Sequence, residues 1–180
     1  MDREPTAKDR PARLPLLLIS GVPATGKSTF TRWLAENRGF LAADIERGGL
    51  GPLGLQSEWD GAVSHGGPAR LVAALHALHR PVALDWGYPP RSLPFVEALC
   101  SAGVGAWWFD GDRDAARRNF IGRGTVPVGA LDRQMANIQA VWPRLAAFCG
   151  GRIIHTVDAE GKFVDWADVI DRIVGKIPQS

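Results

Sequence analysis

Residues 21–28 of this chain have the sequence GVPATGKS, which fits the pattern G-x-x-x-x-G-K-[S/T] at every specified position. An apolar run at 14–20 precedes this stretch and a helix-like run at 27–37 follows it, so it stands at a strand-to-helix turn. Glycines in such a turn let backbone N–H groups converge on phosphate oxygens, and the helix N-terminus adds partial positive charge. The pattern therefore predicts a phosphate-binding loop near the start of the fold.

Nucleotide contacts are expected from this loop and from the helical turn after it. Lys27 can reach the β- and γ-phosphates of a nucleoside triphosphate, and the Ser28 hydroxyl can bind Mg²⁺. The expected cofactors are thus ATP or GTP together with Mg²⁺. The residues of this segment expected to contact the nucleotide are Gly21, Ala24, Thr25, Gly26, Lys27, Ser28 and Thr29.

Outward from the loop, short apolar runs alternate with helix-like stretches, a pattern typical of a parallel sheet covered by helices. Further strands are expected at 40–43, 82–84, 104–109 and 153–157, and further helices at 68–79, 93–101, 113–121, 130–148 and 164–177. Residues 47–67 are rich in glycine and lack periodicity, so we expect a loop with at most one helical turn there. The predicted fold is a three-layer α/β P-loop NTPase fold: a five-stranded parallel sheet with helices on both faces and a small lid.

Composition and charge are those of a globular protein that binds a polyanion. Of the 180 residues, 46% are hydrophobic and 22% are charged, and the net charge of +2 suits a nucleoside triphosphate. Residues 1–13 are polar and resemble no secretion signal, so we expect a flexible tail followed by one domain at 14–180, with a lid at about 117–130. The two cysteines predict a reduced, cytoplasmic location, and no apolar run is long enough to span a membrane.

The size and the order of motifs resemble the nucleoside-monophosphate-kinase-like family of small P-loop kinases. That family includes adenylate, shikimate and gluconate kinases and the chloramphenicol phosphotransferases, and the resemblance covers residues 14 to about 174. The signatures of a regulatory GTPase are missing, because Asp85 is followed by Trp86, Gly87 and Tyr88 and the chain has no Asn-Lys pair. The resemblance implies transfer of a γ-phosphoryl group to a hydroxyl of a small antibiotic-, nucleoside- or sugar-like acceptor.

A carboxylate for the acceptor is expected at the end of the second strand, because ligands bind at the carboxyl edge of an open α/β sheet. Residues 44–47, DIER, resemble the D-x-x-R element of polynucleotide-kinase-like phosphotransferases. The resemblance implies that Asp44 is the catalytic base and that Arg47 steadies the acceptor or the transferring group. The alternative is that Asp44 caps the following helical turn. Glu46 is the weaker candidate and is expected to be solvated.

A second acceptor-side segment, VALDWGYPPR at 82–91, is similar to the D-G-F-P-R segment of adenylate kinases but carries an insertion. By that likeness Asp85 faces the acceptor or binds Mg²⁺ through water, and Arg91 meets an anionic group. Trp86 and Tyr88 would stack on an acceptor ring, or pack against helices instead. The glycine-rich stretch before them, with Trp59, would enlarge the acceptor pocket.

The lid is expected after WWFDGD at 107–112, because this part of the chain resembles the gluconate-kinase lid. The resemblance implies that Arg123 closes on the triphosphate and that Arg118 lies along the nucleotide base, with Gln134 at a matching place. The alternative is that these arginines form a solvated helix face. Val126 stands where the family has a histidine, and the family's G-D-x-x-H element is missing, so gluconate itself is not the expected acceptor.

Four functions are compatible with these motifs: a small-molecule hydroxyl kinase, a polynucleotide 5′-hydroxyl kinase, a toxin-like sugar-nucleotide kinase, and a nucleotide-dependent switch without enzymatic activity. The first is favoured, with a nucleoside triphosphate and a small hydroxylated acceptor as partners. Nucleic acid is not the expected partner, because the stretch after Arg47 as far as Gly67 contains no further Lys or Arg. The sequence leaves a homodimer open.

Overall fold

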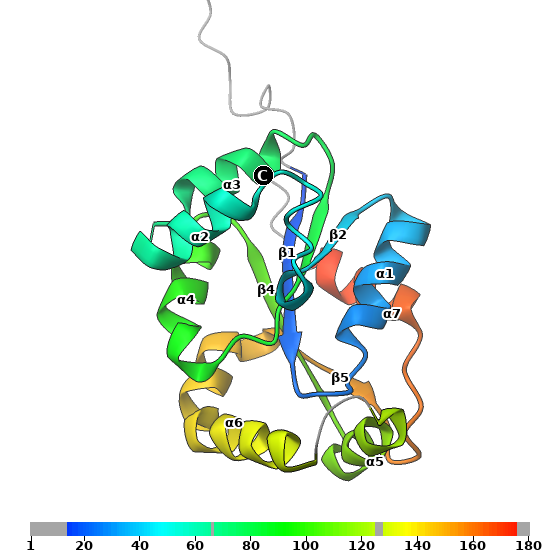
Figure 1. The fold of residues 1–180 in the computed structure, drawn as a ribbon. Helices are drawn as coiled ribbons and strands as arrows, with labels where there is room; N and C mark the ends of the chain where they lie inside the picture. The colour runs from blue at the N-terminus through cyan, green and yellow to red at the C-terminus, as the bar shows by residue number, and fades with distance from the viewer. Residues whose placement is uncertain (1–13, 66, 125–127, 176–180) are drawn as a thin grey trace, which may run out of the picture.

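The computed structural model describes residues 14–65, 67–124 and 128–175. The predicted tail at 1–13 and residues 125–127 of the predicted lid lie outside this part of the chain. Within it, five parallel strands form one sheet in the order β2-β3-β1-β4-β5 (Figure 1). The strands are β1 (Leu16–Gly21), β2 (Leu41–Asp44), β3 (Val82–Asp85), β4 (Gly105–Gly111) and β5 (Ile153–Val157). The predicted α/β fold class is confirmed.

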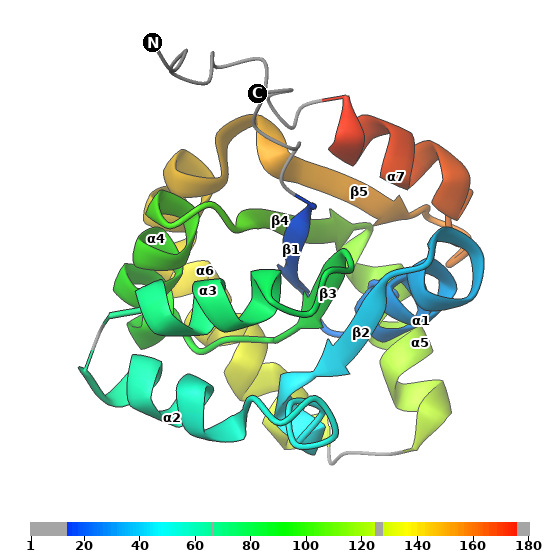
Figure 2. The same ribbon diagram turned by 90° about the horizontal axis from the view of Figure 1, so that it is seen from above.

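Helices cover both faces of the sheet (Figure 2), with α1 and α7 on one face and α2, α3 and α4 on the other. Three short 3₁₀ turns, η2, η3 and η4, join elements. The bounds are α1 (Lys27–Arg38), η2 (Ile45–Arg47), α2 (Gln56–His65), α3 (Ala69–His76), η3 (Pro90–Ser92), α4 (Leu93–Ser101), α5 (Arg113–Arg123), α6 (Val128–Cys149), η4 (Gly150–Arg152) and α7 (Trp166–Val174). Among the helices of the described ranges, none has the length and apolar character that crossing a membrane requires.

The central strand β1 is buried along its whole length because both faces of the sheet are covered. Successive side chains of a strand point to opposite faces. Leu16 and Leu18 accordingly belong to the core beneath α2, α3, α4 and α6, while Leu17 and Ile19 belong to the core beneath α1 and α7. The end of β1 is therefore held from both sides, and it provides a rigid base for the loop that follows.

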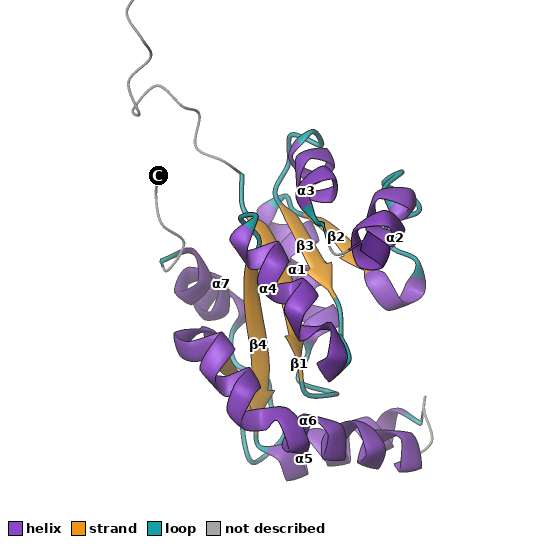
Figure 3. Ribbon diagram, turned by 90° about the vertical axis from the view of Figure 1, so that its left-hand side faces the viewer, coloured by secondary structure: helices purple, strands orange, loops and turns teal. Residues whose placement is uncertain are grey.

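The carboxyl ends of the strands form one edge, and α5 and α6 lie across that edge (Figures 1 and 3). The connection from β1 to β2 runs over one face of the sheet, and the connection from β3 to β4 runs over the opposite face. Such a reversal between the adjacent strands β1 and β3 opens a crevice at their carboxyl ends, which is where open α/β sheets bind ligands. Asp44 and Asp85 are register partners at the ends of β2 and β3, so both lie at this edge.

The prediction of a loop with at most one helical turn at 47–67 is wrong, because the ten-residue helix α2 occupies Gln56–His65. Its sequence gave little sign of a helix, since only Trp59 and Ala62 are buried and the rest is polar, small or exposed. Tertiary packing, rather than local helix propensity, stabilises this helix. The Trp59 ring contacts Trp86 and Phe95 at centroid distances of 4.9 and 5.7 Å. A helix stabilised by one large anchoring side chain has no periodic apolar stripe to detect.

Candidate active site

The loop between β1 and α1 has the geometry of a phosphate cradle. Gly21 has φ of 144°, and a side chain there would place its β-carbon 2.1 Å from the Phe109 carbonyl oxygen. Gly26 is left-handed at φ 83° and begins α1 without a side-chain cap, so no side chain covers the first N–H groups of the helix. Free N–H groups at a helix start, approached by glycine backbone, fit the phosphate groups of a nucleotide.

Two threonine hydroxyls hold this loop in shape. Thr25 Oγ1 donates to the Val22 carbonyl at 2.8 Å, within the loop. Thr156 of β5, which is completely buried, donates to the Thr25 carbonyl at 2.8 Å and to the Asp110 carbonyl at 3.2 Å. Sequence reasoning missed Thr156, because a residue 131 positions away from its partner leaves no local signal.

Lys27 and Ser28 lie at the mouth of the loop. The Lys27 ammonium donates to the carbonyls of Val22 and Gly21 at 3.0 and 3.3 Å. Burial lowers the pKa of Lys27, and the carboxylates of Asp85 and Glu46 oppose that shift. The Ser28 hydroxyl donates to Asp85, whose own pKa is raised, chiefly by its burial.

The Ser28 and Asp85 oxygens are the hard ligands that Mg²⁺ prefers, so the residues present fit the metal. Within the described residues, no group of three or more His, Cys, Asp or Glu side chains could hold a metal by itself. A magnesium ion here would therefore depend on one or two protein oxygens together with nucleotide phosphates and water, which is its usual arrangement beside phosphates.

Asp44 and Arg47 contact each other on the turn after β2. Asp44 Oδ1 accepts a hydrogen bond from the Arg47 N–H at 3.2 Å, which caps η2, and Asp44 Oδ2 lies 3.6 Å from Arg47 Nε. The capping role that the sequence offered as the alternative for Asp44 is thus present. Arg47 is exposed and pairs with the carboxylate beside which it was expected to work.

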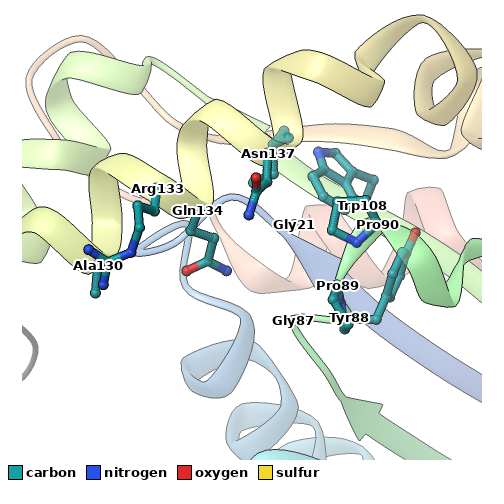
Figure 4. Close-up of a pocket in the computed structure, with 11 residues that line it drawn as sticks. Gly21, Gly87, Tyr88, Pro89, Pro90, Trp108, Ala130, Arg133, Gln134 and Asn137 are labelled. Atoms are coloured by element: carbon teal, nitrogen blue, oxygen red, sulfur yellow. The ribbon is translucent and has the colours of Figure 1, made fainter.

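A cavity of about 300 Å³ opens beside the phosphate loop (Figure 4). The rings of Tyr88 and Trp108 form one side, and Arg133, Gln134 and Asn137 of α6 approach from the other. The complete lining is Gly21, Gly87, Tyr88, Pro89, Pro90, Trp108, Ala130, Arg133, Gln134, Asn137 and Ile138. The cavity combines an aromatic wall with polar donors and acceptors, and it contains no carboxylate in its lining.

Of the α6 residues in this wall, Ala130, Arg133 and Asn137 were absent from the predicted site, and Gln134 was named only as matching the gluconate-kinase lid. Ala130, Arg133, Gln134 and Asn137 share one helical face by their spacing of three and four residues. The signal was therefore present, but a polar stripe on a helix ordinarily faces water.

Trp108, which lines the cavity, and Ser20, which does not, each have a buried polar group without a hydrogen-bond partner among the described residues. Trp108 Nε1 and Ser20 Oγ form no hydrogen bond with the described residues, although the two residues are only 3% and 2% exposed. They are register partners on β4 and β1, which places them side by side in the sheet. Unpaired buried donors and acceptors are uncommon and call for an explanation, such as a bound ligand or water.

The predicted aromatic contacts divide between cavity and core. Tyr88 lines the cavity, whereas Trp86 packs between Trp59 and Tyr88 at centroid distances of 4.9 and 5.5 Å. Trp59 is only 6% exposed and is not among the residues that line the cavity. Arg91 is exposed in η3, also outside the cavity lining.

The predicted lid arginines lie on α5. Arg118 donates to the Ala159 carbonyl at 2.8 Å, so it ties α5 to the segment after β5. Arg123 ends α5 in an exposed position, and its charge contributes to lowering the pKa of Lys27, which places it within electrostatic range of the cradle. Arg117, on the same helix, forms an ion pair with Asp132 of α6 at 3.1 Å.

Together, the strand order and the loop between β1 and α1 define the fold of the P-loop small-molecule kinases. A gluconokinase from Sinorhizobium meliloti 1021 has this fold, with a TM-score of 0.51 and 18% identity over 92% of each chain. A protein from Chloroflexus aurantiacus J-10-fl, provisionally named a kinase, matches with a TM-score of 0.46 and 16% identity over 91% of this chain and 96% of its own. No family profile and no curated protein sequence matches the chain.

Proposed function

We propose that this protein is a small-molecule kinase that transfers the γ-phosphoryl group of ATP or GTP to a hydroxyl of its acceptor. The main support for this proposal is that the loop between β1 and α1 lies directly beside the cavity. Gly21 ends the strand that enters the phosphate loop and also lines the 300 Å³ cavity. Phosphoryl transfer depends mainly on holding donor and acceptor in line, and this arrangement would bring the two together.

On the donor side, the cradle backbone and Lys27 would bind the phosphates. The Lys27 amine, now hydrogen-bonded to loop carbonyls, would turn to the phosphate oxygens. Arg123 would close over the triphosphate from the end of α5, and Arg118 would lie near the base. Ser28 directly, and Asp85 through water, would hold Mg²⁺, which supplies neutralising charge on the phosphates when bound.

On the acceptor side, a small hydroxylated ring compound would occupy the cavity. Tyr88 and Trp108 offer flat apolar surface, and Gln134 and Asn137 offer amide hydrogen bonds. Antibiotic-, nucleoside- and sugar-like acceptors all have these features. The turn after β2 would supply the carboxylate for the acceptor hydroxyl, and the D-x-x-R likeness favours Asp44 for this role. Arg47 and Arg91 would be available to bind an anionic group of the acceptor. We leave Trp59 out of this site because it is packed in the core.

The test is a transfer assay with γ-labelled ATP and GTP against hydroxylated probes such as ribose, uridine, streptomycin and chloramphenicol. Lys27→Ala removes the amine that meets the phosphates, so transfer should fall by orders of magnitude, measured as labelled product. The melting temperature of Lys27→Ala should not fall, because burial makes the charged form of the Lys27 amine unfavourable in the folded protein. The matched control, Arg172→Ala on the exposed face of α7, should transfer normally. Equal transfer by wild type and Lys27→Ala would refute the proposed function.

A further inference from the structure

The turn after β2 carries two carboxylates, and they have different surroundings. Asp44 has both oxygens engaged by its own turn: one accepts the Arg47 N–H and the other lies 3.6 Å from the Arg47 guanidinium. The residue favoured by the sequence is thus already occupied with local structure.

Glu46, two residues later, lies next to a residue that lines the cavity. Its Oε1 is 3.0 Å from the position that a β-carbon on residue 87 would take, so the end of the Glu46 side chain adjoins Gly87. The Gln134 Nε2 lies 3.9 Å from the same position. Gly87 and Gln134 both line the cavity, which places the Glu46 carboxylate at its edge. With the described residues, Glu46 forms no hydrogen bond or ion pair, so its oxygens remain available.

We propose that Glu46, rather than Asp44, is the carboxylate that accepts the proton of the acceptor hydroxyl. This inference rests on the proposed kinase function. In the step, the acceptor O–H bond breaks and its proton passes to Glu46, while the acceptor oxygen forms a bond to the γ-phosphorus. The bond from that phosphorus to the bridging oxygen breaks, and the electron pair leaves with the nucleoside diphosphate. Asp44 then has a structural task, which is to shape the turn that presents Glu46.

The test compares Glu46→Gln with Asp44→Asn in the full chain, using the probe with the highest turnover in the panel above. Glu46→Gln should lower kcat by about a hundredfold or more, the usual size of a general-base effect, with little change in nucleotide affinity. Asp44→Asn should lower kcat far less than Glu46→Gln does, because Asn caps a helical turn almost as well as Asp. Glu36→Gln, the same change on an exposed position of α1, serves as the control and should have no effect.

The outcomes separate the two proposals. Wild-type kcat in Glu46→Gln, with a large loss in Asp44→Asn, would refute the role of Glu46 but leave the kinase function standing. Equal transfer by wild type and Lys27→Ala would refute the kinase function itself.

Discussion

Arg123 shows how a single side chain can matter through its position at the end of an element. It occupies the last position of α5, where the left-handed Gly124 ends the helix. Its positive charge contributes to lowering the pKa of Lys27. No described acidic side chain pairs with it. In the proposed kinase reaction, such an exposed, unpaired guanidinium would bind the charge that spreads over the transferring phosphoryl group.

The substitution Arg123→Lys tests this role while keeping the charge. Lysine lacks the planar fork that binds two phosphate oxygens at once, so kcat should fall more than nucleotide affinity. The measurement is steady-state kinetics together with nucleotide binding by calorimetry. As control, Arg144→Lys changes an arginine that pairs with Glu97 on another part of the surface, and its kinetics should match wild type. Unchanged kcat in Arg123→Lys would assign Arg123 to the solvated face of α5.

At the scale of elements, α2 is the helix that the sequence did not reveal. Only Trp59 and Ala62 of its ten residues are buried, and the Trp59 ring meets Trp86 and Phe95 nearly edge to face. Trp86 in turn contacts Tyr88, which lines the cavity. The helix thus acts on the site indirectly, because it supports the aromatic wall from behind.

Trp59→Ala should therefore destabilise the protein rather than remove an acceptor contact. Truncating a buried tryptophan typically costs about 3–5 kcal/mol, measurable by urea unfolding. Val63→Ala, on the same helix but 47% exposed, should change the unfolding free energy by less than about 0.5 kcal/mol. A Trp59→Ala variant with wild-type stability and lost acceptor affinity would restore Trp59 to the binding site.

At the scale of the whole molecule, the core beneath α2, α3, α4 and α6 contains two weak acids. Burial raises the pKa of the Cys149 thiol from 9.0 to about 11, and burial also raises the pKa of the Tyr88 phenol. Both groups are neutral in the folded core at ordinary pH. Each loses its proton more readily in the unfolded chain, so alkaline pH favours unfolding.

The melting temperature should accordingly be steady below about pH 9 and should fall between about pH 9 and 11. The pKa of the Cys149 thiol is higher in the folded protein than in the unfolded chain. Its contribution to stability is therefore fully present below the unfolded pKa and is lost as the pH rises through the folded pKa. Cys149→Ala should start from a lower melting temperature, because it leaves a small void, but should fall less over that pH range. An identical alkaline fall in both proteins would contradict the role of Cys149. Cys100→Ala, at a half-buried cysteine, is the control and should follow wild type.

The sequence by itself determined the fold class, most of the strands and helices, and the glycine-containing turn between β1 and α1. It did so because these depend on local information: apolar runs of limited length, glycines at a strand-to-helix turn, and the lysine and serine after them. Asp44 and Asp85 were likewise placed at one edge from sequence, since residues that end parallel strands meet at the same edge of a sheet.

The tertiary structure alone decided which side chains face one another across that edge. The cavity combines Gly21, Tyr88, Trp108 and the polar face of α6, segments that are far apart in the chain. Thr156 on the edge strand β5 supports the loop, and the Glu46 side chain lies next to Gly87, which lines the cavity. Such relations depend on how helices and loops pack over the sheet. A one-dimensional pattern records periodicity and turn chemistry, but it does not contain the distance between two groups that only folding brings together.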